Sequence, residues 1–236
     1  MLLRIGLSRV DMILPVSKAL QQEMESYGIK NPFTVIPNTV NTNRFAPSVR
    51  DNDKTKRILT VGGITRIKGV YYLIQAIAKV KNKRDDFVLD IVGEGPLRKE
   101  YEQLSQTLGL DKLIIFHGLK TQTQVAEFMR QSDFVVIPSL WESFSCPLIQ
   151  ALACGKPVIA SNVGGIKEIL NSKLGMLVLS EDVDALAGAI GTMLDEYSSY
   201  DSLILSKYAK ENFGYEAVGK KLDSIYREIK KRADDL

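Results

Sequence analysis

The feature that most constrains the fold is an alternation, from residue 57 onward, of short apolar runs and segments with helical spacing. The runs are rich in Val, Ile and Leu and do not alternate with polar residues, which is typical of parallel strands buried on both faces. They predict strands at 57–63, 87–95, 112–118, 133–139, 156–162 and 175–180. The fold class expected is therefore α/β, with a doubly wound, mostly parallel six-stranded sheet and right-handed crossovers.

Residues 1–56 do not follow this alternation. They predict strands at 10–17 and 33–38 with a helix at 18–28 between them, and a polar, proline-bounded linker at 47–56. We predict two units, a segment with its linker at 1–56 and a Rossmann-like domain at 57–236. The second unit is expected to end in amphipathic helices at 182–196, 202–212 and 215–232.

Composition and charge narrow the class of protein. The 31 basic and 28 acidic residues nearly cancel, which disfavours a nucleic-acid partner. Cys146 and Cys154 lack a CxxC spacing and only His117 could join them as a ligand, so no metal site is expected and the thiols indicate a reducing cytoplasm. The apolar stretches have strand length, and charges interrupt the first sixteen residues, which argues against a membrane span and a signal peptide.

Unusual residues gather at four of the predicted strand ends, where ligands of such sheets bind. The first of these stretches, GGITRIKG at 62–69, places glycines where the backbone can approach a ligand and Lys68 where it can pair with a phosphate oxygen. The alternative is a tight strand–helix turn with an exposed lysine. The stretch matches neither GxxxxGK[ST] nor GxGxxG, which disfavours ATP hydrolysis and dinucleotide binding.

The third stretch is HGLK at 117–120, and the second and fourth carry the same two interpretations. In VGEGP, Gly93 and Gly95 allow a turn pressed against a flat ligand. In SLWESFSCPLIQALACG at 139–155, a helix of about eight residues is expected to begin near Cys146 and to end at Gly155. Its first N–H groups would point into the crevice, and a carboxylate beside them, Glu142, suggests hydrogen bonding to a hydroxyl-rich group. The alternative for Glu142 is a charge at a helix N-terminus.

Several stretches together resemble one family. They are IPNTVNTNRF (36–45), VGGITRIKG (61–69), VGEGPLRKEYEQL (92–104), FHG (116–118), PSLWESFSCPLIQALACGKPVIASNVGGIKEIL (138–170) and GMLV (175–178). In this order and spacing they resemble the carboxyl-terminal, nucleotide-sugar-binding domain of a retaining GT-B glycosyltransferase of the glycogen-synthase-like class, family 4 or glycosyl transferases group 1. The resemblance implies an enzyme that transfers a sugar, with retention, from a nucleoside-diphosphate sugar to an acceptor.

The resemblance also implies the roles of individual residues. Lys68 would contact the diphosphate and Glu142 would lie near the donor sugar, as the catalytic residues, and no metal would be needed because protein cations and amides replace it. The substrate-binding residues implied are Gly62, Gly63, Arg66, Gly93, Gly95, His117, Leu119, Phe144, Ser145, Cys146, Pro147 and Gln150. The loops VGEGP at 92–96 and HGLK at 117–120, which contain four of these residues, would enclose the base.

The sequence departs from the family pattern at three positions. Gln150 replaces the second of two glutamates, Gly63 replaces an arginine for which Arg66 could substitute, and Asn41 replaces an aspartate. The resemblance also implies that 1–56 is a remnant of an amino-terminal domain. The missing part, or a partner subunit, would bind the acceptor and could associate peripherally with a membrane.

Three other functions stay open at this stage. The chain could be a nucleotide-sugar-binding module that is inactive without a partner domain or subunit. A sugar-nucleotide epimerase of the same architecture is less favoured, because the stretch at 143–158 resembles transferases. A dehydrogenase is less favoured still, because the glycine fingerprint is broken.

Overall fold

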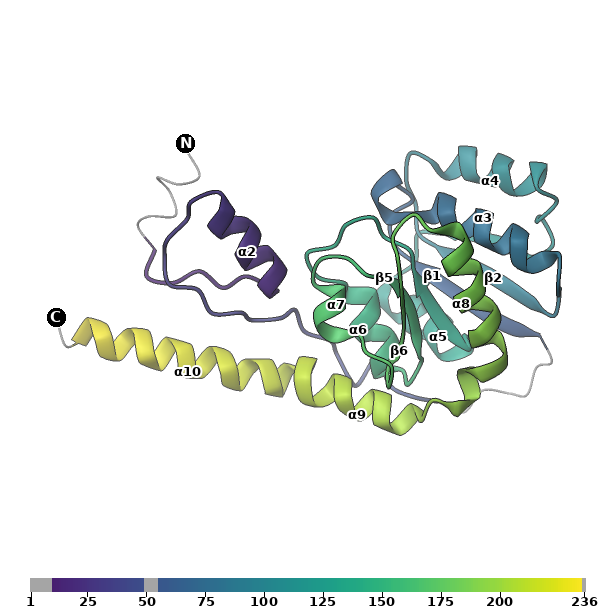
Figure 1. Ribbon diagram of the computed structural model, residues 1–236. Helices are drawn as coiled ribbons and strands as arrows, with labels where there is room; N and C mark the ends of the chain where they lie inside the picture. The colour runs from purple at the N-terminus through teal and green to yellow at the C-terminus, as the bar shows by residue number, and fades with distance from the viewer. Residues whose placement is uncertain (1–9, 49–54, 235–236) are drawn as a thin grey trace.

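A computed structural model describes residues 10–48 and 55–234 of the chain. Its centre is a six-stranded sheet in the order β3-β2-β1-β4-β5-β6, in which every neighbouring pair is parallel (Figure 1). The strands are β1 (Lys56–Val61), β2 (Phe87–Val92), β3 (Ile114–Gly118), β4 (Phe134–Ile137), β5 (Val158–Ser161) and β6 (Gly175–Val178). The predicted doubly wound parallel sheet is confirmed, and all six strands lie within the predicted stretches, apart from Lys56 at the start of β1.

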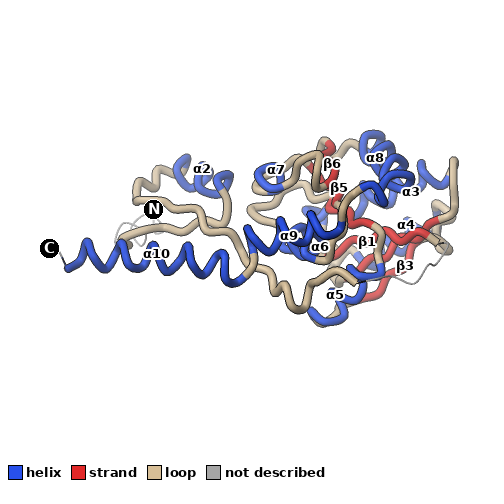
Figure 2. Tube along the Cα trace, turned by 90° about the horizontal axis from the view of Figure 1, so that it is seen from below, coloured by secondary structure: helices blue, strands red, loops and turns tan. Residues whose placement is uncertain are grey.

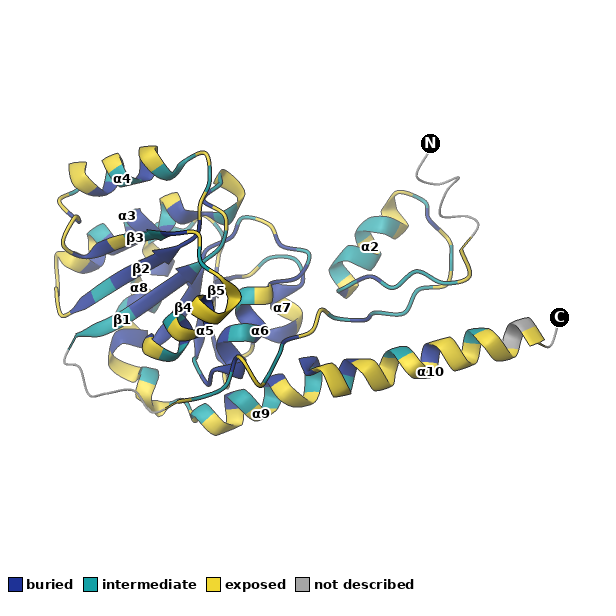
Figure 3. Ribbon diagram, turned by 180° about the vertical axis from the view of Figure 1, so that it is seen from behind, coloured by how far each residue is buried: buried dark blue, intermediate teal, exposed yellow. Residues whose placement is uncertain are grey.

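Helices cover both faces of this sheet, as Figures 1 and 3 show. One layer contains α3 (Val70–Lys81), α4 (Arg98–Thr107) and α8 (Val183–Glu196); the other contains α5 (Gln122–Gln131), α6 (Cys146–Ala153) and α9 (Ser202–Phe213). Two apolar clusters, one on each side, bury the strands between them, and all four residues of β4 and of β5 are buried. This double burial explains why the strands are continuous apolar runs.

The strand order places a crevice at one position of the sheet. The chain moves outward through β1, β2 and β3 and then returns to form β4 on the other side of β1. The helices that follow β1 and β4 consequently lie on opposite faces, and their connecting loops diverge at the carboxyl ends of these two strands. Ligands of open α/β sheets bind at this switch point.

The segment at 10–48 differs from the prediction. The helix expected there is present as α2 (Lys18–Ser26), but the strands expected at 10–17 and 33–38 are wrong, since these stretches share a single isolated bridge between Ile13 and Phe33. Within residues 10–48 and 55–234 no further strand lies beside them, and apolar residues of these stretches pack on a helix instead of forming a ladder. Ile36 is buried against two residues of the last helix, Val218 and Ile225.

That last helix, α10 (Tyr215–Asp234), extends beyond the sheet and runs beside the 10–48 segment in both Figure 1 and Figure 2. The segment is joined to the end of α9, because the Val40 N–H donates to the Phe213 carbonyl over 2.8 Å. The short elements η1 (Arg66–Lys68), α7 (Ile166–Ile169) and η2 (Tyr197–Ser199) complete the described structure. Among its helices, none is both long and apolar enough to cross a bilayer. Most of the predicted linker, residues 49–54, lies outside the described residues, and the division at 56 and 57 stays a prediction.

Candidate functional site

A crevice opens at the carboxyl ends of β1 and β4, where the strand order places it. It is lined by residues of both strand ends, of the loops that follow them and of the start of α6, with the neighbouring end of β2. These residues are Thr60, Val61, Gly62, Gly63, Lys68, Val70, Ile91, Val92, Ile137, Pro138, Ser139, Glu142 and Pro147. The structure therefore brings together five of the predicted site residues, namely Gly62, Gly63, Lys68, Glu142 and Pro147.

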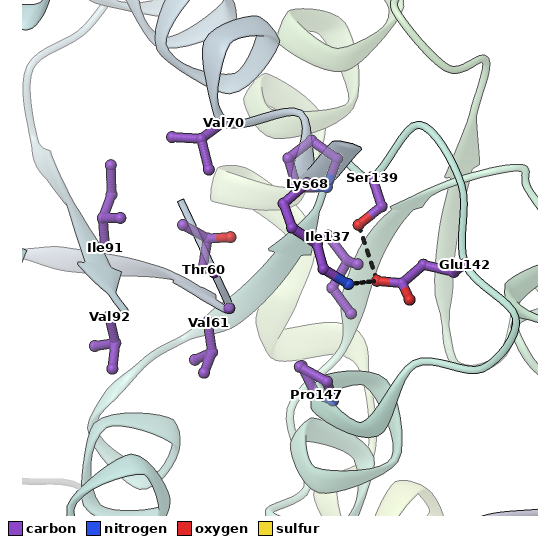
Figure 4. Close-up of a pocket in the computed structure, with 13 residues that line it drawn as sticks. Thr60, Val61, Lys68, Val70, Ile91, Val92, Ile137, Ser139, Glu142 and Pro147 are labelled. Atoms are coloured by element: carbon purple, nitrogen blue, oxygen red, sulfur yellow. Dashed lines mark hydrogen bonds and ion pairs between the residues drawn. The ribbon is translucent and has the colours of Figure 1, made fainter. Parts of the chain in front are cut away.

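An ion pair spans this crevice. The Lys68 Nζ lies 2.6 Å from the Glu142 Oε1, and the Ser139 Oγ donates to the same oxygen over 3.0 Å (Figure 4). Glu142 is buried, with 8% of its surface exposed, so its charge requires such partners. The Lys68 side chain is 35% exposed. Because an ammonium has three N–H groups, Lys68 can bind Glu142 and an anion in the crevice at the same time.

The approach of Lys68 to Glu142 depends on a glycine. Gly69 follows η1 with φ of 67°, and a Cβ on it would lie 1.8 Å from the Pro138 carbonyl oxygen. The absence of a side chain thus lets η1 contact the end of β4, where the Leu140 N–H donates to the Ile67 carbonyl over 2.8 Å. These backbone contacts bring two residues that are 74 positions apart within reach of each other.

The other two glycine turns pack on each other. A Cβ on Gly93, whose φ is 148°, would lie 1.8 Å from the Gly62 carbonyl oxygen, and one on Gly95 would lie 2.3 Å from the Ile64 carbonyl oxygen. The close approach that these glycines permit is therefore made by the neighbouring loop. Gly63 differs from them, since a Cβ there would meet its nearest neighbours at 3.8 Å, an ordinary contact.

The start of α6 presents a buried hydroxyl that lacks a partner within the described structure. Ser145 is the N-cap residue, its side chain caps no N–H group, and its buried Oγ has no hydrogen-bond partner there. The first N–H groups of a helix have no partners within the helix, and its N-terminus favours negative charge. Phe144 turns away into the core, where its ring meets that of Phe213 edge-on with centroids 6.0 Å apart.

Cys146 begins α6 beside the ion pair. The pKa of the Cys146 thiol is raised, mainly because the sulfur is partly buried, although the residue as a whole is exposed. A hydrogen bond from Asn38 lowers this pKa, and the negative charge of Glu142 raises it. The Asn38 Nδ2 lies 3.8 Å from the Cys146 Sγ. Asn38 and Ser139 were not among the predicted site residues. A hydroxyl three positions before a buried carboxylate was a usable signal for Ser139, whereas nothing local marks Asn38.

Besides Gly93, Gly95 and residues 144–146, four more predicted residues lie outside the lining of the crevice, at the end of β3 and in the loop after it, on α6 and on η1. The His117 imidazole is 2.6 Å from the Asp90 Oδ1, with its ring 4.5 Å from that of Phe128. The neighbouring Leu119 is 79% exposed. Gln150 donates to the Gln122 side chain over 3.1 Å. Arg66 is exposed on η1. Binding of a base by the loop at 117–120, of a ribose by Gln150 and of a phosphate by Arg66 stays a prediction.

The comparisons with known proteins identify the family. A family model described as glycosyl transferases group 1 matches residues 41–212. A glycosyltransferase of Methanocaldococcus jannaschii is 30% identical over 186 residues, which are 78% of this chain and 47% of that protein. The gpi3 subunit of phosphatidylinositol N-acetylglucosaminyltransferase from Schizosaccharomyces pombe is 26% identical over 235 residues, 97% of this chain and 51% of that subunit. The chain thus spans about half the length of these curated relatives.

Solved structures agree with the family model. Sucrose-phosphate synthase from Thermosynechococcus elongatus superimposes with a TM-score of 0.86 and 26% identity, over 97% of this chain and 61% of that one. Anabaena HepE, solved with UDP-glucose, gives 0.81 and 21% over 93% of this chain and 64% of that one, which shows the fold alone. The sheet, its switch point and the glycine turns match the pattern that the sequence predicted. Because the family model also covers most of the chain, the chain belongs to the glycosyltransferases of the family glycosyl transferases group 1.

Proposed function

We propose that the chain is the donor-binding half of a glycosyltransferase that moves a sugar from a nucleoside-diphosphate sugar to an acceptor with retention of anomeric configuration. The observation that carries the proposal is the Lys68–Glu142 pair beside the N-terminus of α6. It offers a cation to a diphosphate and a carboxylate to sugar hydroxyls in one crevice. HepE, whose fold this chain shares, was solved with UDP-glucose, a donor of this class.

The chemistry follows from where charge develops. When the bond between the anomeric carbon and the phosphate oxygen breaks, negative charge grows on the diphosphate. Lys68 and the first N–H groups of α6 would stabilise this charge without a metal ion. Glu142 would accept hydrogen bonds from the sugar. The acceptor oxygen would attack from the face that the diphosphate leaves, and its proton would pass to the departing diphosphate oxygen. We also propose a cytoplasmic location.

The acceptor site is proposed to need a further domain or subunit. The chain spans about half of its curated relatives, and one of them is named as a subunit of a larger transferase. Peripheral membrane association is proposed for that other part.

A second candidate is a nucleotide-sugar-binding module with no activity of its own. Two residues favour it: Gln150 carries no charge for a ribose, and Gly63 supplies no side chain to a phosphate although a Cβ would fit there.

Calorimetry followed by turnover assays separates the two candidates. The chain is titrated with UDP-glucose, GDP-mannose and ADP-glucose, and the best donor is then mixed with acceptors and with candidate partner proteins while released nucleotide is measured. Binding and release that persist in EDTA support the metal-free transferase, and NMR coupling at the anomeric proton of the product reports retention. Binding without release in every mixture supports the module. Absence of binding to every donor refutes both.

A further inference from the structure

A carboxylate outside the crevice contacts a helix that precedes the sheet. The Oε2 of Glu168, on α7, accepts the Lys18 N–H over 2.9 Å, and its Oε1 accepts the Ala19 N–H over 2.7 Å. Lys18 and Ala19 are the first two residues of α2, about 150 positions away in sequence. Figure 2 shows α2 next to α7.

Helix α2 has a cap of its own as well. The Ser17 Oγ accepts the Leu20 N–H over 3.1 Å, which is the usual arrangement at a helix start. In the described residues of α2 the first turn carries no acidic side chain, so Glu168 supplies the negative charge that a helix N-terminus favours. One helix start is thus held by two side chains, one local and one distant.

The other side of α7 rests on the loop that carries Glu142. The Gly165 N–H, at the N-cap of α7, donates to the Glu142 carbonyl over 3.1 Å. Gly164 has φ of 44°, and a Cβ on it would lie 1.7 Å from the same carbonyl oxygen. A Cβ on Gly165 would lie 2.3 Å from the Ser143 carbonyl oxygen and 3.0 Å from the Ser17 Cβ. The turn before α7 is therefore in direct contact with the Glu142 backbone and with the start of α2.

We infer that Glu168 is a positioning residue that couples α2 to the loop at 139–145. By binding the start of α2, Glu168 fixes α7, and α7 through Gly165 fixes the backbone of Glu142. The segment at 10–48 and the loop that carries Glu142 are then constrained together. The effect on nucleotide binding rests on the proposed function, whereas the coupling itself does not.

The matched control is the local cap of the same helix. Glu168→Ala removes both distant hydrogen bonds, and Ser17→Ala removes the local one while keeping the Cβ that faces Gly165. Both variants loosen α2, but only the first releases α7. Glu168→Gln keeps one acceptor oxygen and is expected to lie between wild type and Glu168→Ala.

Hydrogen exchange by mass spectrometry tests the coupling without any ligand. Peptides that cover 18–21 are expected to exchange faster in both variants, and peptides that cover 139–145 faster only in Glu168→Ala. An unchanged exchange rate at 139–145 in Glu168→Ala overturns the inference, and so does an equal increase in Ser17→Ala.

Calorimetry with UDP adds a functional readout. Glu168→Ala is expected to weaken binding by about threefold or more, the scale for residues that modulate a site without touching its ligand, and Ser17→Ala to leave it unchanged. Equal affinities in wild type and Glu168→Ala contradict the inference. If the wild type binds no nucleotide, the proposed function fails, and hydrogen exchange alone decides on Glu168.

Discussion

Replacing Lys68 by alanine separates two tasks that the structure gives to one ammonium group. In the unliganded chain Lys68 neutralises Glu142, a residue that is only 8% exposed. In the proposed complex it also binds the diphosphate. The first task affects the free energy of unfolding, and the second affects nucleotide affinity.

The two magnitudes follow from burial and charge. Breaking a fully buried ion pair costs about 3–5 kcal/mol, but the Lys68 side chain is 35% exposed and water can reach Glu142, so we expect about 1–2 kcal/mol. Loss of a hydrogen bond to a charged phosphate costs about 1.5–3 kcal/mol, which weakens UDP binding by about 10- to 150-fold. The exposed pair of Lys79 and Asp184 provides the control, since Lys79→Ala is expected to change stability by about 0.5 kcal/mol or less and binding not at all.

The double variant Lys68→Ala with Glu142→Gln distinguishes the two tasks. It no longer has an unpaired buried charge, so chemical denaturation is expected to show most of the lost stability restored. Calorimetry with UDP, which lacks the sugar that Glu142 would bind, is expected to show affinity as low as in Lys68→Ala. Recovery of UDP affinity in the double variant would refute the assignment, because Lys68 would then act only through Glu142.

Three further predictions concern residues around the crevice. Gly63→Arg is expected to strengthen UDP binding measured by calorimetry, because a Cβ fits at this position and an arginine adds a bidentate phosphate donor; an affinity at or below that of wild type would contradict this. Iodoacetamide is expected to label Cys146 and not the buried Cys154, whose pKa burial raises to about 12, and mass spectrometry should show slower labelling when UDP is bound. The thiolate is the form that reacts, and the pKa of Cys146 is raised above the ordinary thiol pKa of about 8.5, so the labelling rate should still increase above that pH. A labelling rate that reaches a plateau at a lower pH would be inconsistent with the raised pKa. Gly164→Ala is expected to lower the free energy of unfolding by about 2 kcal/mol or more, because alanine is strained at this φ and its Cβ would overlap the Glu142 carbonyl. The control Gly188→Ala, inside α8 with open space around it, should raise the free energy of unfolding by about 0.5–1 kcal/mol. Equal effects of the two substitutions would contradict this prediction.

The fold could be predicted because its main signal is local. A strand buried on both faces must be apolar at every position, as β4 is, and a helix packed on one face shows apolar residues at helical spacing, as α3 does. The same signal failed at 10–17 and 33–38. These stretches are apolar, but whether an apolar stretch joins a ladder depends on a neighbouring strand, and here α10 covers Ile36 instead.

The sequence by itself determined the strand–helix alternation, the family and the identity of Lys68 and Glu142 as candidates, since each of these depends on residue type and order along the chain. Only the tertiary structure decided which groups meet. The contact of Lys68 with Glu142 requires backbone approach at Gly69, the glycines at 93 and 95 accommodate a neighbouring loop, and Glu168 binds the start of α2. Such contacts join residues that are distant along the chain, and they depend on how closely whole elements approach each other, which no local pattern of side chains records.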